Sequence, residues 1–114
     1  MTALIVDDEK DICQLVAAML RKKGVDCYVA NDVASCKEAL EQDKCDLTFL
    51  DLNLPDGSGF DLVSEIRECS PGGKLFIISA HDGEYERSLA KKLGVDGFIK
   101  KPFTKTDILN TLDQ

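Results

Sequence analysis

Polar side chains stand at the ends of four short apolar runs in this sequence. Asp7 and Asp8 follow ALIV, Asp51 follows LTFL, Ser79 follows LFII, and Lys101 follows GFIK. A carboxylate that is buried without a partner is costly, so these acids need either a counter-charge or a place at the edge of the core. Ligands bind beyond the carboxyl ends of the strands in open α/β sheets, so we expect all five side chains to share one crevice.

Such a crevice would have a definite chemistry. Asp7, Asp8 and Asp51 would repel one another, and a hard divalent cation with oxygen ligands would relieve the repulsion, which predicts a Mg²⁺ site. Lys101 adds a fixed positive charge and Ser79 adds a hydroxyl donor. Together these are the groups needed to form and hold a phosphorylated aspartate.

Each residue also has a simpler explanation when it is taken alone. Asp8 could cap a helix, Ser79 could belong to a turn, and Lys101 could be a solvated surface lysine. The shared position of all of them at the ends of strand-like runs favours one common site over three unrelated roles.

Strand-like and helix-like segments alternate along the chain. Apolar or alternating runs predict strands at residues 3–6, 25–30, 47–52, 74–79 and 97–100, and apolar residues at helical spacing predict helices at 11–23, 34–42, 62–69, 83–93 and from 104 to the end. Capping-box spacings at Ser58/Asp61 and Thr104/Asp107 precede two of these helices. The alternation predicts an α/β fold with a parallel sheet covered on both faces, and the second strand suits an edge.

The first predicted helix has an apolar face composed of Ile12, Leu15, Val16, Met19 and Leu20. Five cysteines without Cys-x-x-Cys spacing, and a single histidine, disfavour a zinc site. The cysteines are better explained as small apolar side chains in a reducing compartment than as redox centres.

The length of 114 residues fits one domain, residues 1–114, and no run approaches a membrane span or a signal peptide, so a cytoplasmic protein is expected. The net charge of −7 disfavours direct nucleic-acid binding. Charge is uneven, however: residues 87–105 contain one acid, Asp96, and six basic residues, Arg87, Lys91, Lys92, Lys100, Lys101 and Lys105. This segment is either a partner surface or an ordinary basic helix end.

The segments VDDE, LDLNLPDGSGF, IISA and GFIKKPF, in this order, resemble the receiver domain of two-component response regulators. The similarity extends from Ala3 to the last helix. It implies a flavodoxin-like (βα)5 doubly wound parallel sheet with strand order 2-1-3-4-5.

The resemblance also implies roles for individual residues. Asp51 matches the phosphoacceptor, Asp8 a direct metal ligand, Asp7 an acid that acts through metal-bound water, and the backbone carbonyl of Asn53 a third ligand. A second group matches the switch: Ser79 turns its hydroxyl toward the phosphoryl group, Lys101 pairs with that group and precedes a cis bond to Pro102, and Phe98 is the switch aromatic. Asn53 and His81 match positions that flank the site and tune hydrolysis, although for His81 the simpler explanation, an exposed loop histidine, is favoured.

The function implied is that of a signalling phosphoacceptor, which catalyses its own phosphorylation and slow dephosphorylation rather than acting as a separate enzyme. A histidine kinase or histidine phosphotransfer protein would phosphorylate Asp51 with Mg²⁺ and switch the face formed by the fourth helix, fifth strand and fifth helix toward a downstream effector. The domain would be a monomer or a phosphorylation-dependent dimer.

Three other functions stay open. An aspartyl-nucleophile phosphohydrolase of the haloacid-dehalogenase type would want Asp where Asn53 stands. A non-phosphorylated interaction module would not need the acid, serine and lysine set. A flavodoxin-like nucleotide binder would need a glycine-rich phosphate loop after the first strand, and there is none.

Overall fold

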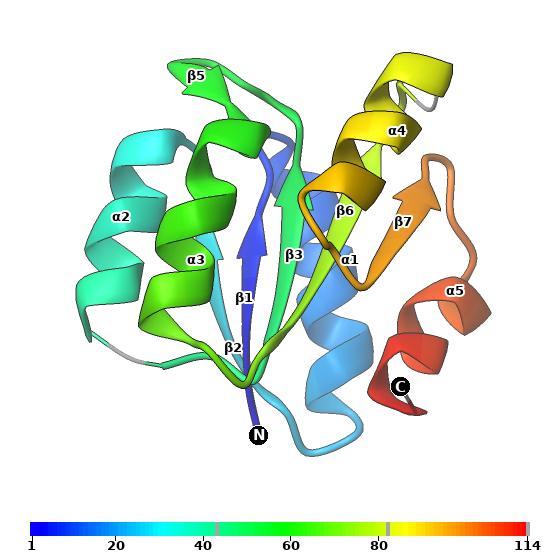
Figure 1. The fold of residues 1–114 in the computed structure, drawn as a ribbon. Coiled ribbons are helices and arrows are strands. Elements are labelled where there is room, and N and C mark those ends of the chain that lie inside the picture. The colour runs from blue at the N-terminus through cyan, green and yellow to red at the C-terminus, as the bar shows by residue number, and fades with distance from the viewer. Residues whose placement is uncertain (43, 82, 114) are drawn as a thin grey trace.

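The sheet that carries the polar strand ends is formed by five parallel strands. The computed structural model describes residues 1–42, 44–81 and 83–113. The strands are β1 (Thr2–Val6), β2 (Asp26–Ala30), β3 (Leu47–Asp51), β6 (Lys74–Ser79) and β7 (Gly97–Lys100), in the order β2-β1-β3-β6-β7 (Figure 1). Counted along the chain this is the predicted order 2-1-3-4-5, and the second strand lies at an edge as expected.

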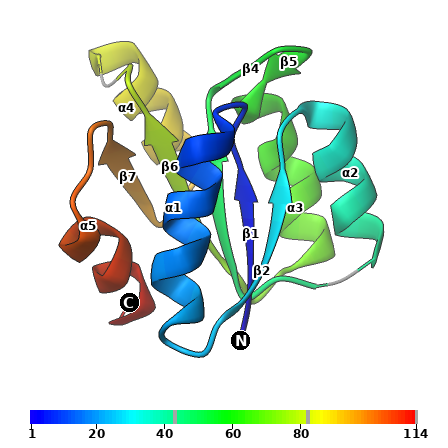
Figure 2. The same ribbon diagram turned by 180° about the vertical axis from the view of Figure 1, so that it is seen from behind.

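Helices cover both faces of the sheet (Figures 1 and 2). One face packs against α2 (Val33–Gln42), α3 (Val63–Cys69) and α4 (Glu84–Lys92), and the other packs against α1 (Lys10–Arg21) and α5 (Lys105–Leu109). The doubly wound α/β architecture predicted from the sequence is therefore confirmed. Within the described ranges, no helix is both long and apolar enough to cross a bilayer.

The three central strands, β1, β3 and β6, are buried on both sides because the sheet has a core on each face. In β1, Leu4 and Val6 belong to the core under α2, α3 and α4, whereas Ala3 and Ile5 belong to the core under α1 and α5. Successive side chains of a strand point to opposite faces, so a strand buried on both faces loses the alternation of apolar and polar residues.

The buried face of α1 differs from the predicted one. Leu15 is 48% exposed, while the residues buried on this helix are Cys13, Val16, Ala17 and Leu20. These four have the spacing i, i+3, i+4, i+7 of a helical stripe. The small side chains of Cys13 and Ala17 let α1 approach the sheet closely. The middle of the buried stripe therefore lies on the Cys13 and Ala17 side of the helix, and Leu15 falls outside it.

Two short elements near Asp51 were not predicted. A hairpin of β4 (Asn53–Leu54) and β5 (Gly57–Ser58) is followed by the 3-10 helix η1 (Gly59–Leu62). Ser58 Oγ accepts from the Phe60 N–H at 3.2 Å. The bond to Asp61 that a capping box would use is therefore replaced by a bond to a residue one position nearer. A 3-10 turn brings a nearer N–H within reach of the cap.

The C-terminal helix begins with its predicted cap and then changes type. Thr104 and Asp107 form the expected capping box. The helix was predicted to run to the end of the chain, but α5 gives way to the 3-10 helix η2 (Asn110–Asp113), and Gln114 lies outside the described residues.

Three cysteines, Cys13, Cys36 and Cys45, are buried in the two cores as predicted, whereas Cys27 and Cys69 are half-buried against them. Burial raises the pKa of the free Cys13 thiol to about 11 and that of the free Cys36 thiol to about 12. A thiol that resists ionisation is a poor nucleophile, which agrees with a packing role.

Candidate functional site

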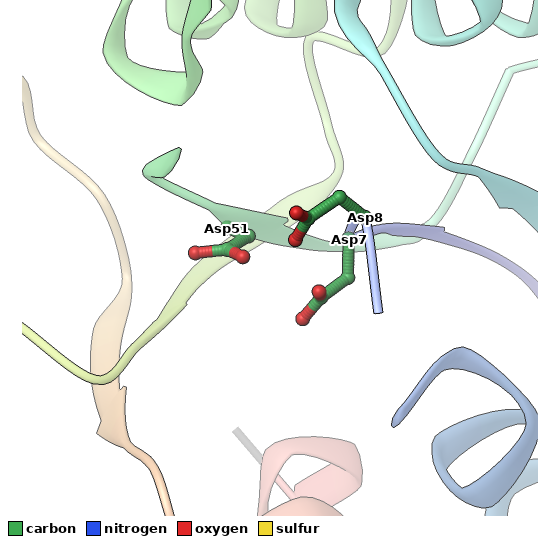
Figure 3. Close-up of side chains that lie close together, drawn as sticks. All are labelled: Asp7, Asp8 and Asp51. Atoms are coloured by element: carbon green, nitrogen blue, oxygen red, sulfur yellow. The ribbon is translucent and has the colours of Figure 1, made fainter. Parts of the chain in front are cut away.

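The first and third strands of the chain are neighbours, and this brings the predicted acids together. Val6 is in register with Leu50, so Asp7 and Asp51 leave the sheet at the same level. One carboxylate oxygen from each of Asp7, Asp8 and Asp51 lies within 4.8 Å of the others (Figure 3). Asp7 and Asp51 are 1% and 5% exposed, while Asp8 is exposed, so the cluster opens to solvent on one side.

Lys101 holds the cluster from the end of β7. Its Nζ lies 2.8 Å from Asp7 Oδ2, 3.0 Å from Glu9 Oε1 and 3.3 Å from Asp51 Oδ2. The backbone supports this reach, because the Lys101 N–H donates to the Ser79 carbonyl at 2.9 Å. The bond between Lys101 and Pro102 is cis, as the resemblance implied. Burial alone would lower the pKa of Lys101, but its contacts with Asp7 and Glu9 and the charge of Asp51 raise it above its ordinary value.

The pKa of the buried Asp7 carboxyl is shifted upward. Burial raises its pKa to about 6, although the Lys101 ammonium and the Glu9 N–H lower it, and the charge of Asp51 adds to the rise. Among the described residues, the buried Oδ2 of Asp7 accepts no well-aligned hydrogen bond, and its contact with Lys101 is ionic. Three carboxylates, those of Asp7, Glu9 and Asp51, therefore share one ammonium, and the deficit of positive charge favours a further cation.

The donor set fits a hard divalent cation. Carboxylate oxygens on three residues, one of them reachable from solvent, suit Mg²⁺ or Ca²⁺, which take oxygen ligands and keep some water. The Asn53 N–H donates to Asp51 Oδ1 at 3.3 Å, which places this residue beside the cluster. Coordination by its carbonyl stays a prediction.

Ser79 and Phe98 lie where the sequence predicted, on β6 and β7. Ser79 is fully buried, and its Oγ accepts from the His81 N–H at 3.0 Å, which leaves the hydroxyl hydrogen available for another acceptor. The side chain of His81 is exposed. Phe98 is half-buried, and the guanidinium carbon of Arg87 lies 4.8 Å from its ring centroid, a cation–π contact.

Sequence reasoning missed two of these groups. Glu9 was visible only as the residue after the acid pair, and Arg87 only as one member of the basic segment. Neither has a spacing that points to the site, because one contact depends on the reach of Lys101 and the other on how α4 packs over β7.

A glycine closes the loop behind the acid cluster. A Cβ built on Gly59 would lie 2.0 Å from the Asp51 carbonyl oxygen, an impossible approach to backbone. We expect Gly59→Ala to lower the free energy of unfolding by about 3 kcal/mol, because the backbone next to Asp51 must shift. Urea denaturation would measure it. Gly72→Ala is the matched control, since a Cβ there meets nothing within 4 Å, and equal stabilities of the two variants would contradict the steric argument.

Removing one charge from the cluster should stabilise the metal-free protein. In Asp51→Asn, Asp7 loses the repulsion of its neighbour while Lys101 keeps its contacts with Asp7 and Glu9. We expect a gain of about 1 kcal/mol in thermal or urea unfolding in EDTA. A saturating divalent cation should shrink or reverse the gain, and a clear loss in EDTA would show that the Asp51–Lys101 pair outweighs the repulsion.

Comparisons with known proteins agree with this geometry. The family model described as response regulator receiver domain matches residues 3–113. The chain is 31% identical over 109 residues to the probable transcriptional regulatory protein TcrX of Mycobacterium tuberculosis, covering 96% of this chain and 47% of TcrX. It thus spans less than half the length of that relative.

Solved structures share the fold. A CheY-like receiver domain protein from Methanospirillum hungatei superposes with a TM-score of 0.91 at 24% identity, over 98% of this chain and 90% of that one. A Burkholderia pseudomallei response regulator, solved with a phosphorylated aspartic acid, calcium ion and citrate, gives 0.91 at 22% identity, over 97% and 65%. On the family match, the chain belongs to the response regulator receiver domains of two-component systems.

Proposed function

We propose that residues 1–114 form one receiver domain in which Asp51 accepts a phosphoryl group. The donor would be the phosphohistidine of a sensor histidine kinase or of a histidine phosphotransfer protein. The reaction would take place in the cytoplasm. The observation that carries the proposal is the convergence of Asp7, Asp8 and Asp51 within 4.8 Å, with Lys101 in contact with both Asp7 and Asp51.

The covalent step uses the Asp51 carboxylate as nucleophile. One of its oxygens attacks phosphorus, the P–N bond of the phosphohistidine breaks, and an acyl phosphate forms on Asp51. Asp7, Asp8, Asp51 and the Asn53 carbonyl would hold Mg²⁺, which neutralises charge on the phosphoryl oxygens when it is bound. The Burkholderia structure, with a phosphorylated aspartate and a calcium ion, supports a divalent cation at such a site.

Lys101 and Ser79 would stabilise the product. The Lys101 ammonium already lies 3.3 Å from Asp51 Oδ2, so it can pair with a phosphoryl group there without crossing the site. Ser79 is one residue beyond Ile78, the register partner of Asp51, and its hydroxyl hydrogen is available to donate. A shift of Ser79 toward the phosphoryl group would leave room behind it.

The switch would follow from that shift. Phe98 would move inward behind Ser79 and leave the Arg87 guanidinium that now covers its ring. The surface that changes would be the α4–β7–α5 face, which carries most of the basic segment, and a downstream effector would recognise it. The receiver domain itself would be a monomer or a phosphorylation-dependent dimer. TcrX bears the name of a transcriptional regulatory protein and is about twice as long, so an effector domain in the same polypeptide is one form of this proposal.

The receiver would catalyse its own phosphorylation and slow dephosphorylation. Phosphorylation from acetyl phosphate, without any kinase, tests this directly. Incubation with acetyl phosphate and Mg²⁺ should add the mass of one phosphoryl group in intact-protein mass spectrometry, and EDTA should prevent the gain. No gain at saturating Mg²⁺ would contradict the proposal.

A further inference from the structure

The β4–β5 hairpin that follows Asp51 is too short to hold its own position. Each strand has two residues, 53–54 and 57–58, joined by the Pro55–Asp56 corner. Two-residue corners normally use turns with positive φ, but none of the described non-glycine residues has a positive φ. Isolated hairpins are marginal in water even when they are longer. Contacts with the rest of the molecule must therefore set where this hairpin lies.

Asp56 makes such a contact with the N-terminus of α2. Its Oδ1 accepts from the Val33 N–H at 2.7 Å and its Oδ2 accepts from the Ala34 N–H at 3.2 Å. The first N–H groups of a helix have no partner within the helix, and the helix dipole favours a negative charge there. Packing adds to this, because a Cβ on Gly57 would lie 3.2 Å from Val33 Cγ2. Both views place β5 beside this end of α2 (Figures 1 and 2).

The helix does not depend on Asp56 for its local cap. Asp32 Oδ1 accepts from the Ser35 N–H at 2.7 Å, which is the usual N-cap bond of α2. Asp56 comes from 23 residues away in the chain, so its two bonds join separate elements. Their main effect should fall on the short hairpin rather than on the ten-residue helix.

The other end of the hairpin reaches the acid cluster. The Asn53 N–H donates to Asp51 Oδ1 at 3.3 Å, and the Gly59 N–H donates to the Leu52 carbonyl at 2.8 Å, which closes the loop. The segment before α2 is also attached to the site, since Asn31 Nδ2 donates to the Asp7 carbonyl at 2.8 Å. Hydrogen bonds and short stretches of backbone thus link the start of α2 to both buried acids.

We propose that Asp56 is a positioning residue for the candidate metal centre. By tying the hairpin to α2, it fixes Asn53 beside Asp51, so that the loop is in place before a cation or a phosphoryl group arrives. The inference depends on the proposed function, because the metal belongs to it. Its structural half, the anchoring of residues 53–59, does not.

The experiment compares Asp56→Ala with Asp32→Ala, because each removes one carboxylate from the same helix terminus. Mn²⁺ binding is followed by electron paramagnetic resonance, and amide hydrogen exchange is measured at residues 53–59 in EDTA. Asp56→Ala should weaken Mn²⁺ binding by about 3- to 10-fold, near the lower end of outer-shell effects, and speed exchange at residues 53–59. Asp56→Asn, which keeps one acceptor, should fall between Asp56→Ala and wild type. Asp32→Ala should change neither readout, although it lowers the melting temperature.

Two results would overturn the inference. In one, Asp32→Ala weakens Mn²⁺ binding as much as Asp56→Ala, which would reduce Asp56 to a general helix cap. In the other, Asp56→Ala leaves both readouts at the wild-type level. If the wild type itself binds no Mn²⁺, the proposed function fails, and the exchange at residues 53–59 still decides whether Asp56 anchors the loop.

Discussion

Asp51→Asn is expected to abolish phosphorylation by acetyl phosphate. In the proposal Asp51 supplies the nucleophilic oxygen, and one of its carboxylate oxygens lies 3.3 Å from Lys101 Nζ while the other accepts from the Asn53 N–H. An amide nitrogen in place of one oxygen removes the charge and most of the nucleophilicity. Phos-tag electrophoresis after incubation with acetyl phosphate and Mg²⁺ should show a shifted band for wild type and none for the variant.

The matched control is Asp61→Asn, an exposed acid in the 3-10 helix of the same loop. It loses the same charge without touching the cluster, and it should shift like wild type. Treatment with hydroxylamine should remove the shifted band, as expected for an acyl phosphate. An equal shift in Asp51→Asn and wild type would move the phosphoacceptor to another residue.

Lys101→Met is expected to cause a large loss of stability in the metal-free protein. Its ammonium contacts Asp7, Glu9 and Asp51, and its side chain is 11% exposed. Removing one partner of a buried ion pair leaves an uncompensated charge, here on two buried carboxylates, so the expected loss is about 3 kcal/mol in urea denaturation with EDTA at pH 8. Lys92→Met, at the exposed end of α4, should change stability by less than about 0.5 kcal/mol.

Two conditions should reduce this loss, and both follow from the charge of the cluster. Saturating Mg²⁺ replaces part of the missing positive charge and stabilises whatever binds it. Acid acts through Asp7, whose folded pKa of about 6 lies above its ordinary value of 3.8. Stability is therefore lost as the pH rises from about 3.8 to about 6, and the cost is complete above that range. At pH 5 the folded Asp7 is still mostly protonated and does not need the ammonium, so the lost lysine should be less damaging there. A penalty that is the same at pH 5 and pH 8, with or without Mg²⁺, would contradict the electrostatic account.

The sequence was sufficient to predict the strands and the polar residues at their ends, because both depend on local patterns. Apolar runs defined the strands, and the polar residue after each run marked its carboxyl end. Parallel strands then place Asp7, Asp51 and Lys101 at one edge whatever the details of packing. The strand order itself came from the family resemblance, and the structure confirms it.

What the sequence could not predict depends on tertiary distances. Asp56 lies 23 residues from Val33, whose N–H donates to it, and the contact of Arg87 with Phe98 requires a particular packing of α4 over β7. The exposure of Leu15 has a similar cause, because close packing of α1 on the sheet selects the smaller side chains of Cys13 and Ala17 as the buried stripe. Periodicity gives an angular range for such a stripe, and only the partner surface fixes its centre.

The parallel arrangement of the strands also decides when the acidic crevice can come into existence. Every ladder of the main sheet joins segments separated by a crossover, and the residues that meet there are 44 and 50 positions apart, from Asp7 to Asp51 and from Asp51 to Lys101. A nascent chain that has not yet produced β7 would hold its carboxylates without their ammonium. On the proposed function, phosphorylation of Asp51 would therefore require the complete five-stranded sheet, and the fraction of a preparation that a small donor phosphorylates would report how much of it has folded fully.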